Sequence, residues 1–95
     1  MEREMKYMIC WSIGPENYTV AMDNFLKSGA PMPEGLTSLG RYHAPGSSKG
    51  WVVCETENPR YLAEFIAEWS PVAKFEVTPV LEDAEAGKAV AKART

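Results

Sequence analysis

The chain contains few of the residues from which metal and redox sites are built. It has two cysteines and one histidine among 95 residues. Cys10 and Cys54 each lie in an apolar run, form no CxxC motif and have no histidine nearby in the sequence, which argues against a zinc site. A disulfide between them would require neighbouring strands of suitable geometry. We therefore predict two small buried thiols in a reducing compartment, no metal site and no cofactor.

The chain also lacks an excess of positive charge and any long apolar run. Its 10 lysines and arginines stand against 13 aspartates and glutamates, which gives a net charge of −3. Nucleic acids and anionic membrane surfaces both require a basic patch, so we expect neither as a partner. No stretch approaches the roughly 18 apolar residues of a membrane span, and no signal-peptide pattern precedes the first apolar run. We expect a soluble, cytoplasmic protein.

Recognisable catalytic motifs are absent from the sequence as well. No Ser-His-Asp or Cys-His arrangement indicates a nucleophile. The segment from Gly46 to Gly50 is rich in glycine and serine. It lacks the Gly-Lys-Ser/Thr of a phosphate-binding loop, however, and a strand rather than a helix is predicted after it. The sequence therefore assigns no reaction, and its clearest information concerns architecture.

Apolar residues alternate in some segments and recur at helical spacing in others. Alternation predicts strands, whereas recurrence at i, i+3 and i+4 predicts amphipathic helices. Pro15 and the Asn58-Pro59 pair are typical helix starts, and Gly29 and Pro71 mark helix ends. In chain order we predict a strand over 5–13, a helix over 15–28, strands over 36–43 and 51–55, a helix over 59–70, a strand over 75–80 and a helix over 83–92.

This order of segments predicts an α+β, ferredoxin-like βαββαβ domain with a C-terminal helix. The whole chain, 1–95, suits one domain, with its core over about 5–80. The right-handed crossover rule places both central helices on one face of a four-stranded antiparallel sheet, with spatial strand order 4-1-3-2. The helix over 83–92 has few large apolar groups, so we expect it to pack loosely or to fray.

Two helices can cover only one face of such a sheet, yet the strands are apolar on both. Tyr7, Ile9 and Trp11 share the parity that we expect to face the helices. The opposite, uncovered face mixes apolar and polar side chains. It carries Met8, Cys10, Ser12, Trp51, Val53, Glu55, Glu76, Thr78 and Val80, with either Leu39, Arg41 and His43 or Gly40 and Tyr42 from the strand over 36–43.

We predict that a second copy of the chain covers this face. Two sheets stacked face to face would hide the apolar side chains and leave a small, polar-lined chamber between them. The expected assembly is a homodimer, a face-to-face dimeric α+β barrel, whose chamber is available to a small organic ligand.

Five colinear segments resemble a known family of small proteins. They are 5–18 (MKYMICWSIGPENY), 33–44 (PEGLTSLGRYHA), 53–56 (VCET), 63–69 (AEFIAEW) and 75–80 (FEVTPV). The family is the one grouped as domain of unknown function 3303, and the likeness leaves out residues 1–4 and the tail after about residue 83. That family is similar to the dimeric α+β barrel group, which implies a ferredoxin-like protomer and a face-to-face homodimer. The resemblance implies no activity and no catalytic residues.

His43 and Arg41 are the candidate catalytic residues. His43 could act as a general base, because histidine titrates near neutrality. Arg41 lies two residues earlier on the same strand face and could hold a carboxylate or phosphate. A purely structural interpretation remains open, in which His43 ends a strand and Arg41 pairs with a glutamate.

The candidate ligand-binding residues extend this pair across the predicted chamber. Trp51 offers a flat surface on which a ring could stack. Glu55 and Glu76 could orient the pair, balance its charge or form a carboxylate pair of the acid–base type. The full predicted set is Arg41, His43, Trp51, Glu55, Glu76 and Ser12.

Two functional interpretations follow. We prefer a non-enzymatic dimeric module that binds a small molecule or serves as an interaction module. The alternative is a cofactor-free, monooxygenase- or isomerase-like barrel enzyme with His43 as base and Arg41 as anion holder. The alternative requires both side chains to point into the chamber between the two sheets.

Overall fold

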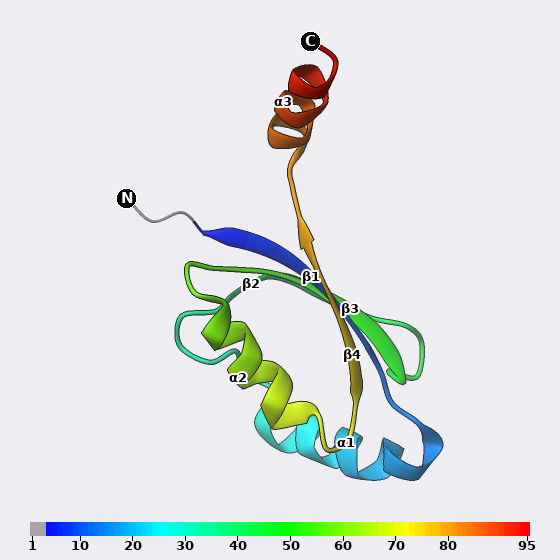
Figure 1. The fold of residues 1–95 in the computed structure, drawn as a ribbon. Coiled ribbons are helices and arrows are strands. Elements are labelled where there is room, and N and C mark those ends of the chain that lie inside the picture. The colour runs from blue at the N-terminus through cyan, green and yellow to red at the C-terminus, as the bar shows by residue number, and fades with distance from the viewer. Residues whose placement is uncertain (1–3) are drawn as a thin grey trace.

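The strands and helices follow the spacing of the apolar residues along the chain. The structure, a computed structural model, describes residues 4–95. Its element order is β-α-β-β-α-β-α, as predicted (Figure 1). The elements are β1 (Met5–Ser12), α1 (Pro15–Ser28), β2 (Thr37–His43), β3 (Lys49–Thr56), α2 (Pro59–Trp69), β4 (Lys74–Val80) and α3 (Asp83–Ala93).

The four strands form one antiparallel sheet in the order β2-β3-β1-β4. Strand β1 is central, with Ile9 opposite Val52 of β3 on one side and Val77 of β4 on the other. Helices α1 and α2 lie on the same side of this sheet (Figure 1). The predicted ferredoxin-like α+β fold and strand order are confirmed.

Local sequence signals set the helix boundaries. Helix α1 starts at Pro15, whose fixed φ suits a first turn, and ends at Gly29, which has a φ of 73° and donates its N–H to the Phe25 carbonyl. Helix α2 is capped by Asn58, whose side-chain oxygen accepts a 2.9 Å hydrogen bond from the Arg60 N–H. These boundaries determine which side chains each helix turns toward the sheet.

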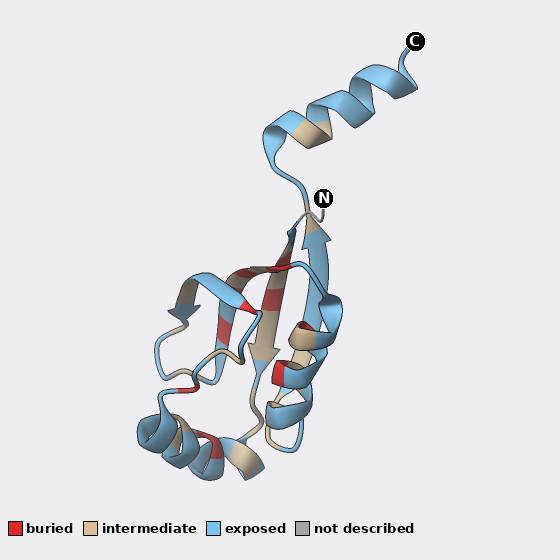
Figure 2. Ribbon diagram, turned by 90° about the vertical axis from the view of Figure 1, so that its left-hand side faces the viewer, coloured by how far each residue is buried: buried red, intermediate tan, exposed pale blue. Residues whose placement is uncertain are grey.

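The core lies between α2 and the central strands (Figure 2). Ile9 and Cys54 are 0% exposed, and Leu62 and Phe65 of α2 pack against them at 5% exposure each. Helix α1 contributes far less to this core, because Ala21 is its one buried residue. Since α1 approaches the sheet less closely than α2 does, space remains beneath it, and that space is the candidate site described below.

Helix α3 extends away from the body of the molecule (Figures 1 and 2). None of its residues is buried, and Val90 is 55% exposed. An ion pair of 2.5 Å between Lys6 Nζ and Glu82 Oε2 joins the base of this helix to β1. The hydrogen bond of this pair raises the pKa of Lys6 and lowers the pKa of Glu82. Exposed pairs of this kind contribute little stability.

Candidate functional site

A β-bulge in β2 decides which way the candidate catalytic residues point. Ser38 lies opposite Cys54, but Gly40, two residues later, lies opposite the adjacent Val53. The extra residue is Leu39, and it shifts the alternation of side chains in the rest of the strand. A bulge needs a permissive backbone, which Gly40 provides.

Beyond the bulge, β2 turns Arg41 and His43 toward the helices. Arg41 lies opposite Val52, which is 1% exposed beneath the helices, and His43 lies opposite Gly50. Tyr42 lies opposite Trp51 and points to the other side of the sheet. Of the two possibilities that the sequence left open, the uncovered face therefore takes Gly40 and Tyr42.

The predicted ligand-binding residues consequently fall on two different faces. Arg41 and His43 share the helix-facing side, while the other four lie on the uncovered face. The six residues therefore do not share one face, and Arg41 and His43 do not point toward the face where two sheets would meet, as the enzymatic alternative requires. The four residues on the uncovered face are Ser12, Trp51, Glu55 and Glu76.

Glu55 and Glu76 are not placed to act as a carboxylate pair. Strand β1 lies between their strands, with Glu55 opposite Lys6 and Glu76 opposite Cys10. Strands lie about 4.8 Å apart and residues rise about 3.3 Å along them, so the two positions are separated by more than about 10 Å. An acid–base pair at hydrogen-bonding distance is therefore absent from this face.

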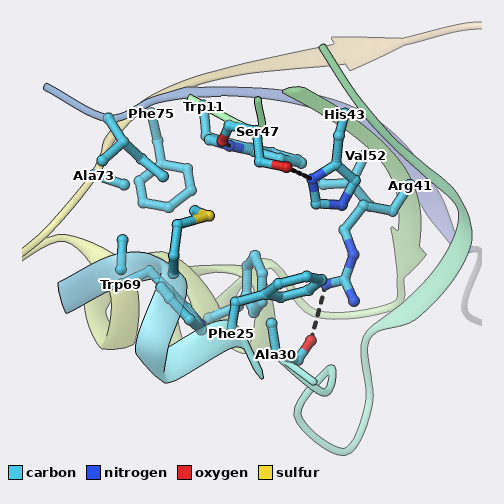
Figure 3. A pocket seen from close by; sticks show the side chains of 14 residues that line it. Trp11, Phe25, Ala30, Arg41, His43, Ser47, Val52, Trp69, Ala73 and Phe75 are labelled. Atoms are coloured by element: carbon cyan, nitrogen blue, oxygen red, sulfur yellow. Dashed lines mark hydrogen bonds between the residues drawn. The ribbon is translucent and has the colours of Figure 1, made fainter. Parts of the chain in front are cut away.

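An apolar cavity lies on the helix-facing side, between α1 and the sheet. Its volume is about 60 Å³. Arg41 and His43 stand at one end, and Trp69, Ala73 and Phe75 at the other (Figure 3). The lining residues are Trp11, Ile13, Ala21, Met22, Phe25, Ala30, Arg41, His43, Ser47, Val52, Phe65, Trp69, Ala73 and Phe75.

The hairpin between β2 and β3 closes the end of this cavity that is bordered by His43. Ser47, held at a φ of 67°, has its Oγ 3.2 Å from His43 Nδ1, and the two atoms share a hydrogen bond (Figure 3). Its carbonyl accepts a 3.4 Å hydrogen bond from the indole N–H of Trp11. The hydroxyl of Tyr18 on α1 donates to the Gly46 carbonyl at 2.6 Å. The hairpin thus joins β1 and α1 around the imidazole.

Arg41 connects the sheet to the end of α1. Its Nη1 donates to the Ala30 carbonyl at 2.8 Å, and its Nη2 donates to the Gly29 carbonyl at 3.0 Å. The guanidinium carbon lies 5.7 Å from the centre of the Phe25 ring. A cation here satisfies carbonyl groups that a helix C-terminus leaves without partners. Within residues 4–95, Arg41 forms no ion pair, so its predicted pairing with a glutamate is wrong.

Two aromatic rings contact His43, which is exposed, at the same end. Its ring centre lies 5.1 Å from that of Trp11, in an edge-to-face arrangement, and 5.3 Å from that of Phe25. Trp11 can reach this position because the facing residue of β3 is Gly50, and a β-carbon on Gly50 would overlap the indole. The imidazole therefore packs against both Trp11 of β1 and Phe25 of α1.

The two cysteines do not supply a reactive site inside the cavity. Cys54 is fully buried beneath α2, where desolvation raises its pKa to about 11 and keeps the thiol protonated. Cys10 is half-buried on the opposite face, and both thiols are free. Within residues 4–95 no cluster of side chains suited to a metal ion occurs, and no helix is both long and apolar enough to cross a membrane.

The cavity itself was not predicted from the sequence. Its apolar lining comes mainly from three strands and two helices, and these positions give the same signal as an ordinary core. One signal becomes readable once the strand register is known, namely the pairing of a large aromatic residue, Trp11, with a glycine, Gly50, on the neighbouring strand. Such a pairing indicates that a ring lies flat across the sheet.

The chain matches a known protein family. Residues 5–94 match the family model described as Domain of unknown function (DUF3303). The match extends through α3, so the tail after about residue 83, which the resemblance left out, lies within the matched region. No curated protein matches the chain.

Proposed function

The chain belongs to the Domain of unknown function (DUF3303) family, and we propose that it is a non-enzymatic homodimeric module that binds a small organic molecule. The observation that carries this proposal is the cavity between α1 and the sheet (Figure 3). We therefore place the ligand site on the helix-facing side, where Arg41 and His43 lie, instead of on the uncovered face.

The cavity has the composition of a small-molecule site. Such sites are mainly apolar and aromatic, with a few polar groups that orient the ligand. Here Trp11, Phe25 and Phe75 supply ring surfaces, and Arg41 and His43 border one end. Their polar atoms are bonded to the protein itself, so the surface offered to a ligand is apolar.

The uncovered sheet face supports a homodimer. Tyr42 is 66% exposed and Trp51 is 39% exposed, and these two residues lie opposite each other on β2 and β3. Met8 and Val53, paired on β1 and β3, extend the same patch and are half-buried. Fully burying a large apolar side chain stabilises an interface by roughly 1.5–3 kcal/mol, so a second copy would gain by covering this face.

The state of the cysteines supports a cytoplasmic location as part of the proposal. Cys10 and Cys54 are both free and lie on opposite faces of the sheet. Free thiols of this kind are typical of a reducing compartment.

The enzymatic alternative is not proposed, because its two residues do not face the interface between sheets. Within the cavity, the Arg41 guanidinium is bonded to the carbonyls of Gly29 and Ala30 and the His43 imidazole to the Ser47 hydroxyl. If the protein is a non-enzymatic module, His43→Ala should keep both its fold and any retained ligand. A turnover that disappears in His43→Ala while the fold is unchanged would favour the enzyme instead.

Native mass spectrometry of the protein purified from its own host tests the proposal. The expected species is twice the 10.5 kDa chain, with a small organic molecule attached. Ala21→Leu, which fills the cavity, should lose the added mass, whereas Ala63→Leu on the exposed side of α2 should keep it. A bare 10.5 kDa species in all three proteins would contradict the proposal.

A further inference from the structure

We infer that α3 is an arm whose apolar side packs on the uncovered sheet face of a second copy of the chain. This inference rests on the proposed homodimer and names the element of the partner that covers the face. It derives from the surface that the chain leaves exposed, from the distribution of side chains around α3, and from the position and shape of the apolar part of the uncovered face.

The chain is more extended than a compact domain of its length, with α3 standing off the body (Figures 1 and 2). Its radius of gyration is 15.6 Å, against about 12.4 Å for a compact domain of 95 residues. Its accessible surface is 6683 Å², which exceeds by roughly 1,300 Å² the surface of a folded monomer of 10.5 kDa. Each partner contributes about 800 Å² to a standard protein interface. The chain therefore exposes enough surface for an interface with a second copy.

The side chains of α3 divide into a charged side and a side of small apolar residues. Lys88 and Glu85 form an ion pair of 3.1 Å on the charged side. Ala86, Val90 and Ala93 recur at i, i+4 and i+7, which places them together on the other side. Val90 is 55% exposed, and no residue of α3 is buried. Because a helix of 11 residues is marginal on its own in water, α3 gains stability from a surface that covers its apolar side.

The base of α3 lies on the side of the uncovered face. Lys6 shares the parity of Met8 and Cys10 in β1, so its side chain lies on that face. Its ion pair with Glu82 brings the residue that precedes α3 to the same side. From there α3 runs away from its own sheet (Figures 1 and 2). Its apolar side is therefore available to a second copy at the face that the homodimer buries.

The apolar residues of the uncovered face form a band that crosses the strands. One row of the band joins Tyr42, Trp51 and Cys10, and the next row joins Val53 and Met8. The rows on either side carry charged residues instead. These are Lys49 and Lys74 beside Ser12 at one end of the strands, and Glu55 beside Lys6 at the other. The surface that requires cover is therefore a narrow band within the face.

A single helix has the dimensions of this apolar band. The 11 residues of α3 extend about 16 Å, and four strands spaced about 4.8 Å apart span about 14 Å. The small side chains of Ala86 and Ala93 allow the helix to lie close to the rings of the band. Val90, between them, supplies the largest apolar contact. The α3 of a second copy therefore covers the band and keeps its charged side in water.

Amide hydrogen exchange of the full-length protein tests this contact. Since no residue of α3 is buried within one protomer, its amides should exchange rapidly when the protein is diluted to the 10.5 kDa chain. In the dimer they should exchange more slowly by about tenfold or more. Rapid exchange of α3 in a wild-type dimer would overturn the inference and leave the homodimer intact. Slow exchange that persists in the diluted monomer would place α3 on its own protomer, which also overturns the inference.

Two variants assign the contact to one side of α3. Val90→Glu puts a charge on the apolar side, so it should remove the protection of α3 and weaken dimerisation by about tenfold or more, as measured by analytical ultracentrifugation. Ala91→Glu adds the same charge one residue later, about 100° around the helix axis, and should behave like the wild-type protein. Equal effects of the two substitutions would refute the arm. A wild-type protein that is monomeric at every concentration would contradict the homodimer as well.

Discussion

Trp11 of β1 lies flat across Gly50 of β3, and its indole occupies the space that a β-carbon at position 50 would need. This relationship shapes the cavity. The indole lines the cavity on the side of the sheet, donates its N–H to the Ser47 carbonyl and makes an edge-to-face contact with the His43 ring. The first prediction follows from it.

Gly50→Ala should displace the indole and destabilise the fold. The added methyl would also meet the Tyr42 carbonyl oxygen at 2.6 Å, so the strand itself must shift. Overpacking of this kind costs about 1–3 kcal/mol, measurable by urea unfolding. Gly87→Ala in α3 is the matched control, because a β-carbon there meets nothing within 4 Å. It should leave stability unchanged or raise it slightly, and equal losses in both variants would refute the assigned role of Trp11.

Arg41→Ala should release the C-terminal end of α1. The loss of two hydrogen bonds from a charged donor to Gly29 and Ala30 should lower the free energy of unfolding by about 1–2 kcal/mol, since the group is half-exposed. Amide hydrogen exchange should accelerate in α1 and remain unchanged in α2.

Arg60→Ala provides the comparison for that experiment. Arg60 forms an exposed ion pair with Glu64 at 3.6 Å and should change stability by no more than about 0.5 kcal/mol. If exchange in α1 is the same in Arg41→Ala as in the wild-type protein, Arg41 does not anchor the helix.

The buried thiol of Cys54 should make stability fall at alkaline pH. Burial raises its folded-state pKa from 9.0 to about 11, so the thiolate forms more readily in the unfolded chain. The stabilisation of the folded state by the buried neutral thiol is complete below about pH 9 and is lost as the pH rises toward 11. The free energy of unfolding then falls by at most about 1.4 kcal/mol per pH unit. Urea unfolding from pH 8 to pH 10.5 should show this slope in the wild-type protein and in Cys10→Ala. Cys54→Ala should show a smaller slope, and identical slopes in all three proteins would contradict the prediction.

Trp51→Glu should dissociate the proposed homodimer. The substitution places a charge in the centre of the uncovered sheet face, where desolvation in an interface is costly. Light scattering at micromolar concentration should show the dimer for the wild-type protein and the 10.5 kDa chain for the variant. Leu26→Glu introduces the same charge at another exposed apolar residue, 81% exposed on α1, and should remain dimeric. A wild-type protein that is already monomeric would disprove the interface.

The sequence predicted the fold because every element carried its own signal. Pro15 marks the start of one helix and Gly29 its end, and Asn58 caps the next helix. The alternation in β1 identifies the side of the sheet that faces the helices. Each of these signals depends on residues that are neighbours in the chain. Helix boundaries and strand order could therefore be derived before any contact was known.

The candidate site was harder to predict because it depends on two features of tertiary structure. The bulge at Leu39 reverses the alternation within β2, and periodicity alone could only offer two orientations for Arg41 and His43. The distance of α1 from the sheet is the second feature. It depends on how Trp11 and Phe25 share the space beneath the helix, which no local pattern encodes.

The central claim is that the space between α1 and the sheet receives a ligand, and methionine methyl groups report on it most directly. Met22 lines the cavity, whereas Met8 lies on the opposite face of the sheet. In protein labelled with ¹³C at the methionine methyls, a small apolar probe, dissolved cyclopropane, should give nuclear Overhauser effects from its protons to the Met22 methyl and none to the Met8 methyl. Contacts to Met8 without contacts to Met22 would place the ligand on the uncovered face and contradict the account.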